Sequence, residues 1–202
     1  GWEVLFDEQY AGRIALINDP MESMAVALVV NGFDINTNDP TELGRAAELL
    51  ISHKDMNYQL LSEMDITEKM LSEEIWAALT YSGEIIQKTV GMDEFVYIIP
   101  EAGYSVWVDN LCIPAGSQHK EVANMLINHI LDARVSAEIA SALLLPNTNL
   151  AAAKYTDAKV MADKRLYPSA ILLRKGQAFS CDEFSLEKQQ IYNKTWQVLT
   201  AD

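Results

Sequence analysis

The sequence offers little from which a metal site or a disulfide framework could be built. It contains two cysteines and three histidines among 202 residues. Cys112 and Cys181 are far apart and lack the short spacing of metal-binding cysteine motifs, and no two histidines have the HxxxH spacing of a helical zinc site. We therefore expect no metal and no cofactor. For the two cysteines, a disulfide and two free thiols both stay open.

Long hydrophobic runs are also missing. A helix that spans a bilayer needs about 18 to 20 consecutive apolar residues, and the longest run, around residues 24–30, is much shorter. This run predicts part of a buried helix. The first residues, GWEVLFDEQYAG, do not have the pattern of a secretory signal, so targeting indicates no compartment.

Basic residues are scarce relative to acidic ones. Lys and Arg number 15 against 29 Asp and Glu, which gives a net charge of -14. A chain of this charge repels nucleic acid and attracts cations. The sequence therefore predicts no nucleic-acid partner. Acidity that only keeps the protein soluble is the alternative to a cationic ligand.

Half of the residues are hydrophobic, which is ordinary for a globular domain, and their pattern alternates between strand and helix. The segments expected as strands are 13–17, 58–61, 75–81, 95–99 and 104–114. Those expected as helices are 21–30, 40–53, 67–71, 84–89, 120–132, 133–143 and 183–199. Strands that alternate with helices predict α/β layering with a largely parallel sheet.

Two carboxylates follow the first expected strand. Asp19 stands at the strand end, and Glu22 lies three residues later in the helix. Acids at a helix N-terminus cap it and favour its dipole, which explains the pair without any function. Alternatively, they bind a ligand at the carboxyl edge of a parallel sheet, where α/β proteins form their sites. Tyr81, which ends another expected strand, is placed at the same edge.

An aspartate in an apolar strand is the second unusual feature. In YSVWVDNLCIP, Trp107 and Asp109 are two residues apart and share one face of the expected strand. A buried carboxylate needs a partner, which can be Arg, Lys, backbone amides or an external cation. An alkylammonium suits both side chains, because cation–π attraction to an indole contributes about 0.5–2 kcal/mol. The pair is therefore a candidate amine site, with Asp19 and Glu22 available for a second amine.

Three segments of the chain resemble one family of proteins. They are WEVLFDEQYAGRIALINDPMESM, YSVWVDNLCIPAGSQHKEVANMLINHIL and LPNTNLAA. All resemble bacterial spermidine/putrescine-binding proteins, the periplasmic receptors of polyamine ABC importers, and the resemblance extends over residues 2–199. It implies a periplasmic-binding-protein-like (type II) α/β fold, with two lobes that clamp the ligand in a cleft.

The resemblance also implies which residues bind the ligand. Asp19 and Glu22 match the carboxylate pair of the second lobe that binds amine groups. Trp107 and Asp109 match a pair that binds a further amine and stacks on methylene groups.

At other matching positions the chain departs from the family pattern. Tyr81 stands where the family commonly has Trp, which affects the preference between spermidine and putrescine. A polar ligand residue aligns with Ser62 or Glu63. Leu145 replaces an aromatic residue, so one cleft wall is less aromatic.

The matched part of the family leaves the first lobe incomplete. We expect residues 1–108 to form the first part of the second lobe, 109–152 the crossing strand and a helical part of the first lobe, and 153–202 the return to the second lobe. The apolar faces of the helical part then need a partner, for instance Leu126, Ile127 and Ile130, and a homodimer is one outcome. With half of the cleft absent, binding by this chain is expected to be weak.

The resemblance gives the protein a periplasmic location, an ABC permease as docking partner and no enzymatic activity. Two alternatives stay open. One is a receptor for another small cationic solute. The other is a hydrolase that uses Asp19 and Glu22 as an acid–base pair, although the sequence has no nucleophile elbow and no phosphate-binding loop.

Overall fold

The computed structural model describes residues 1–56, 58–180 and 184–201. Its strands are β1 (Ile14–Ile17), β2 (Gln59–Leu61), β3 (Ala77–Ala78), β4 (Tyr104–Val106) and β5 (Gly176–Ala178). Its α-helices are α1 (Pro20–Val30), α2 (Pro40–Ser52), α3 (Glu63–Leu71), α4 (Ser82–Lys88), α5 (Lys120–Leu131), α6 (Ala133–Leu143), α7 (Ala158–Ala162), α8 (Ala170–Leu173) and α9 (Leu186–Thr200). Short 3-10 helices are η1 (Trp2–Phe6), η2 (Glu8–Tyr10), η3 (Lys54–Met56) and η4 (Leu150–Ala152). Cys112 is exposed, and Cys181 lies outside the described residues.

The strands form two parallel sheets. The larger has the order β2-β1-β3, and β4 pairs with β5 in the smaller. All four residues of β1 are buried, as expected for a central strand covered on both faces. The predicted parallel α/β arrangement is confirmed.

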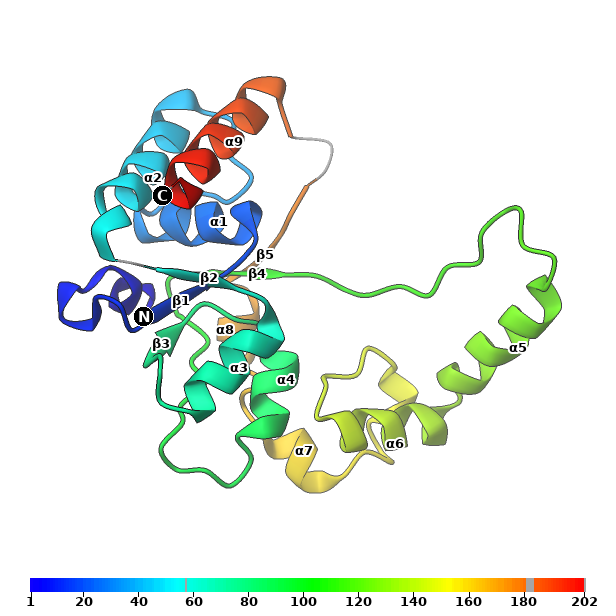
Figure 1. Ribbon diagram of the computed structural model, residues 1–202. Coiled ribbons are helices and arrows are strands. Elements are labelled where there is room, and N and C mark those ends of the chain that lie inside the picture. The colour runs from blue at the N-terminus through cyan, green and yellow to red at the C-terminus, as the bar shows by residue number, and fades with distance from the viewer. Residues whose placement is uncertain (57, 181–183, 202) are drawn as a thin grey trace.

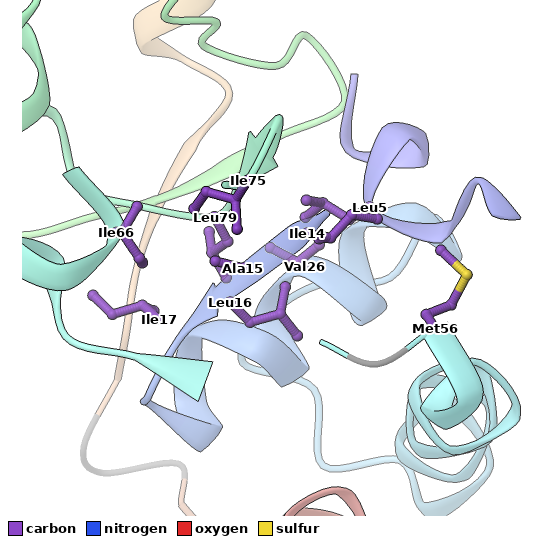
Figure 2. Packing of buried hydrophobic residues seen from close by; sticks show 10 residues of the cluster. All are labelled: Leu5, Ile14, Ala15, Leu16, Ile17, Val26, Met56, Ile66, Ile75 and Leu79. Atoms are coloured by element: carbon purple, nitrogen blue, oxygen red, sulfur yellow. The ribbon is translucent and has the colours of Figure 1, made fainter. Parts of the chain in front are cut away.

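Helices cover both faces of the larger sheet. On one side α1, α2 and α9 pack together, and on the other side α3 packs with α4 (Figure 1). The main apolar core joins β1 to Val26 of α1 and Ile66 of α3 (Figure 2). This core holds the carboxyl ends of β1 and β2 at one edge of the sheet.

Three expected strands are shorter than predicted or absent. Residues 95–99 form no strand, because among the described residues no neighbouring strand pairs with them. The segment 75–81 contributes only Ala77–Ala78, which pairs with the beginning of β1. The segment 104–114 forms a strand only over Tyr104–Val106, where β5 supplies a partner. Alternating apolar residues favour an extended backbone, but a strand also requires an adjacent one.

Beyond β4 the chain leaves the main body. Residues 107–119 form no helix or strand and lead to α5, which lies far from the sheets (Figure 1). No residue of α5 is buried, and Leu126 is 58% exposed. The apolar face of α5 therefore has no cover within the described part of the chain, apart from its contact with α6.

Two structural properties of the described residues concern function directly. None of the helices that the structure describes is long and apolar enough to cross a membrane. Within residues 1–56, 58–180 and 184–201, no three His, Cys, Asp or Glu side chains come together in a group that could hold a metal ion.

Candidate functional site

A hollow of about 390 Å³ lies at the carboxyl ends of β1 and β2. It is lined by Ile17, Asn18, Asp19, Leu61, Ser62, Glu63 and Tyr81. The backbone N–H of Asn18 donates to the carbonyl of Leu61 at 2.8 Å, which keeps the two strand ends together. Because both strands are parallel, the residues that follow each strand meet at the same edge. The predicted edge site therefore has a physical basis in the described structure.

Asp19 begins α1. Its side chain accepts a hydrogen bond from the backbone N–H of Met21 at 2.7 Å, and Pro20 occupies the first helical position. This geometry matches the capping role expected from the sequence. Capping uses Oδ1, so the residue caps the helix and lines the hollow at once.

Glu22 lies in the first turn of α1 and is only 5% exposed. Its Oε2 accepts a hydrogen bond from the hydroxyl of Ser105 in β4 at 2.6 Å. Burial raises the pKa of the Glu22 carboxyl, the charge of Asp19 raises it further, and the hydrogen bond from Ser105 opposes both effects. Glu22 is therefore a desolvated carboxylate supported by a neutral donor.

Tyr81 connects the acidic residues to an aromatic neighbour. Burial and the negative charges of Glu22, Asp19 and Glu63 raise its pKa to about 12. Trp107 contacts the Tyr81 ring edge to face, with 4.6 Å between ring centroids and 75° between the ring planes. Three carboxylates and two aromatic rings thus share one region, which is a suitable arrangement for an alkylammonium.

Ser62 and Glu63 both line the hollow but have different partners. Ser62 caps α3, and its hydroxyl donates to Asp65 at 2.6 Å. Glu63 Oε1 accepts from the backbone N–H of Glu84 at 3.3 Å, and its charge acts on Tyr81. Of the two positions that the sequence left open, Glu63 belongs to the carboxylate group, and the hydroxyl of Ser62 is directed at α3.

Asp109 is exposed beyond the end of β4 and does not line the hollow. The prediction that Trp107 and Asp109 share a strand face is wrong, because β4 ends at Val106 where its pairing with β5 ends. Trp107 lies against Tyr81, whereas Asp109 is exposed in the segment that leads away to α5. A role for Asp109 in binding stays a prediction.

Among the described residues, no basic side chain forms an ion pair with the acids that line the hollow, Asp19 and Glu63, or with the neighbouring Glu22. Ion pairs in that part of the chain join Lys69 to Glu74, Arg165 to Asp163 and the amino terminus to Glu3. Asp19, Glu22 and Glu63 are instead oriented by backbone N–H groups or by a hydroxyl. Their negative charge therefore stays available to an external cation.

Sequence reasoning missed two residues near this site. Ser105 supports Glu22, and period-two alternation could have found it, because it precedes Trp107 by two residues in the expected strand. Tyr97 has a pKa raised by burial, with an interaction to Ser82 that opposes the shift and a smaller raising effect from Glu63. The position of Tyr97 in an expected strand did not indicate its interactions with Ser82 and Glu63.

Comparisons with known proteins agree with these features. Residues 1–167 match the model of the family described as bacterial extracellular solute-binding protein. A spermidine/putrescine-binding periplasmic protein of Salmonella typhimurium is 30% identical over 176 residues, which are 87% of this chain and 50% of that protein. A putrescine/cadaverine-binding protein of Pseudomonas aeruginosa is 25% identical over 205 residues, which are 96% of this chain and 57% of that protein.

A solved structure shows a similar fold. The spermidine/putrescine ABC transporter substrate-binding protein of Streptococcus pneumoniae matches with a TM-score of 0.82 at 19% identity, covering 98% of this chain and 62% of that one. The chain spans about half the length of the curated relatives it matches. At this identity the structural likeness establishes the fold, while the ligand has to be argued from the site.

Proposed function

Because this chain belongs to the family of bacterial extracellular solute-binding proteins, we propose that it is part of a receptor that captures spermidine or putrescine for an ABC importer. Its fold is the α/β fold of a type II periplasmic binding protein, present in part. The proposed ligand residues are Asp19, Glu22, Ser62, Glu63, Tyr81, Trp107 and Asp109.

One observation carries the proposal: the negative charges of three carboxylates act on the Tyr81 phenol, and none of the three has an ion-pair partner among the described residues. Each anion on its own has a structural explanation, such as the cap formed by Asp19. Together they create a negative hollow that an ammonium group satisfies through charge-assisted hydrogen bonds. The neighbouring rings of Tyr81 and Trp107 suit the methylene groups between the amines.

Binding of this kind requires no covalent chemistry, so we infer a receptor without enzymatic activity. In the proposed whole protein, the second lobe holds the amines and a hinge motion closes the other lobe over them. The closed form then docks on a permease in the periplasm or outside the cell. The relatives named as periplasmic binding proteins support this location and role.

We propose the same division of the chain that the sequence predicted. Residues 1–108 and 153–202 contribute to one lobe, and 109–152 contribute a crossing segment and helices of the other. The position of α5 at the end of a long extended segment supports this division (Figure 1). The described part of the chain leaves the apolar face of α5 without a cover of its own.

A second copy of the chain is our proposed cover for this face. Sedimentation velocity should then show a concentration-dependent dimer, and Leu126→Glu should shift it to the monomer because a charge is placed in the apolar contact. Ile171→Glu provides a control, since Ile171 is also exposed but lies in α8. A wild-type chain that stays monomeric at high concentration contradicts the homodimer.

Isothermal calorimetry with spermidine and putrescine tests the ligand proposal. We expect weak but measurable binding by the wild-type chain, and weaker binding by Asp109→Ala if the extended segment folds toward the hollow when ligand is present. Asp93→Ala is the control, because Asp93 is equally an exposed acid in a loop. Equal binding by the wild-type chain and Asp109→Ala contradicts the assignment of Asp109.

The two alternatives make different predictions in the same experiments. A receptor for another small cation responds in a thermal-shift panel to that cation and not to polyamines, since bound ligand raises apparent stability. A hydrolase shows turnover that Glu22→Gln abolishes. The aromatic pair of Tyr81 and Trp107 suits a ligand with methylene groups, which supports the polyamine receptor.

A further inference from the structure

The hydrogen bond between Ser105 and Glu22 joins two elements that are remote in the sequence. Ser105 belongs to β4, and Glu22 belongs to the first turn of α1, 83 residues earlier. The backbone of Ser105 is held in the ladder with β5, where it lies opposite Gln177. The hydroxyl therefore comes from a rigid position and meets the carboxylate at 2.6 Å.

The Ser105 hydroxyl donates to one carboxylate oxygen of Glu22, and the other oxygen has no donor among the described residues. Oε2 accepts from Ser105, and Oε1 has no hydrogen bond within the described part of the chain. A carboxylate can accept at both oxygens, so Oε1 can still receive an ammonium. A basic residue in place of Ser105 would neutralise the charge that the ammonium needs, whereas a hydroxyl does not.

We propose that Ser105 is a positioning residue for cation binding: it fixes the orientation of the buried Glu22 carboxylate and keeps it anionic beside the hollow. This inference rests on the proposed polyamine function and adds to it a residue that contacts no ligand. Because Ser105 precedes Trp107 by two residues, the same hydrogen bond ties α1 to the strand that ends beside the Tyr81–Trp107 contact.

Apart from the neutral Ser105 hydroxyl, few groups influence the pKa of Glu22. Asp19 raises the pKa of Glu22, and Tyr81 senses the charge of Glu22 in turn. Among the helices packed on α1, α9 carries the buried Lys188, whose ammonium donates to the carbonyl of Ile35 and lies over the rings of Phe184 and Tyr192. Removal of the Ser105 hydroxyl therefore takes away the one opposing influence and raises the pKa of Glu22.

Two measurements on Ser105→Ala test the inference. A carboxyl NMR titration without ligand should give a higher midpoint for Glu22 than in the wild-type chain. Calorimetry near pH 6 should give an affinity for spermidine about tenfold lower, since a lost hydrogen bond to a charged group has an effect of this order. The pH below which binding is lost should move upward, because a carboxyl of higher pKa is protonated at higher pH.

Two further variants separate positioning from a general structural effect. Ser105→Thr keeps the hydroxyl and should restore the titration midpoint and the affinity. Ser52→Ala removes an exposed hydroxyl whose hydrogen-bond partners in the described structure, Leu49 and His53, lie at the end of the same helix. This variant should change neither the titration midpoint of Glu22 nor the affinity. An unchanged Glu22 midpoint in Ser105→Ala overturns the role of Ser105, whether or not polyamine binds. Absence of polyamine binding by the wild-type chain contradicts the proposed function instead, so the two failures are distinguishable.

Discussion

Replacing Glu22 by glutamine is expected to weaken the binding of spermidine and putrescine by about 10- to 100-fold, the usual effect of removing one charged hydrogen bond. Glutamine keeps the size of the side chain and can still accept from Ser105, so the variant removes the charge and little else. The loss should be large because Glu22 is buried, where water does not screen its attraction to an ammonium. Isothermal calorimetry at neutral pH measures it.

The chain supplies a matched control for this substitution. Glu42→Gln alters the glutamate of a second Asn-Asp-Pro-X-Glu segment, at the same position in α2 as Glu22 has in α1. Unlike Glu22, Glu42 has no hydrogen bond with Ser105 and does not act on the pKa of Tyr81. We expect its affinity for polyamines to equal that of the wild-type chain. Similar losses in both variants would mean that overall negative charge attracts the ligand without a specific site.

The stability of Glu22→Gln should move in the opposite direction from its affinity. The pKa of Glu22 is raised in the folded chain, so its ionised form disfavours folding above that pKa, and this penalty disappears below the pKa of the unfolded chain. Thermal denaturation should therefore show Glu22→Gln more stable than the wild-type chain at neutral pH, with the difference vanishing near about pH 4. A variant that loses both affinity and stability at neutral pH contradicts this interpretation.

The two Asn-Asp-Pro-X-Glu segments also show what the sequence can and cannot predict. Both aspartates cap their helices, as the local pattern predicts: Asp19 accepts from Met21, and Asp39 accepts from Thr41 and Glu42. The two segments share the same motif, yet only the first segment lies beside Ser105 and Tyr81. Which of two identical motifs becomes part of a site depends on the strands around it, and these come from distant parts of the chain.

The strands illustrate the same difference between local and remote information. The apolar run that forms β1 was predictable, because a buried central strand is apolar on both faces. The segment 95–99 has a similar composition but finds no partner strand among the described residues. Pairing is a property of two segments, so one segment's pattern cannot establish it. The Trp107–Asp109 prediction was wrong for this reason, since strand pairing ends at Val106.

The contact between Tyr81 and Trp107 connects the proposed ligand site to the extended segment. Tyr81 follows β3 and directly precedes α4, and Trp107 begins the extended segment that leads to α5. A ligand between the carboxylates and these rings therefore touches the part of the chain that links the two proposed lobes. In this arrangement ligand binding can bias the direction of the extended segment, because a ligand shifts an equilibrium toward the state it binds more tightly.

Two leucines in helices of similar length should respond very differently to truncation. Leu28→Ala is expected to lower the free energy of unfolding by about 2–5 kcal/mol, because it leaves a cavity in a closed core. Leu28 is fully buried in α1 among side chains of α2 and α9. Leu126→Ala in α5 should change the free energy of unfolding by less than about 0.5 kcal/mol, the usual range for exposed positions.

Urea denaturation followed by far-UV circular dichroism measures both values, at a concentration where sedimentation shows the chain to be monomeric. Leu126 is the matched control for Leu28, since the substitution is the same and both leucines lie inside a helix. If Leu126→Ala destabilises the monomer as much as Leu28→Ala does, the apolar face of α5 is covered by the chain itself. That outcome would remove the reason for proposing a second copy, whereas the expected contrast places the closed core of the described chain around α1, which carries Glu22 and is capped by Asp19.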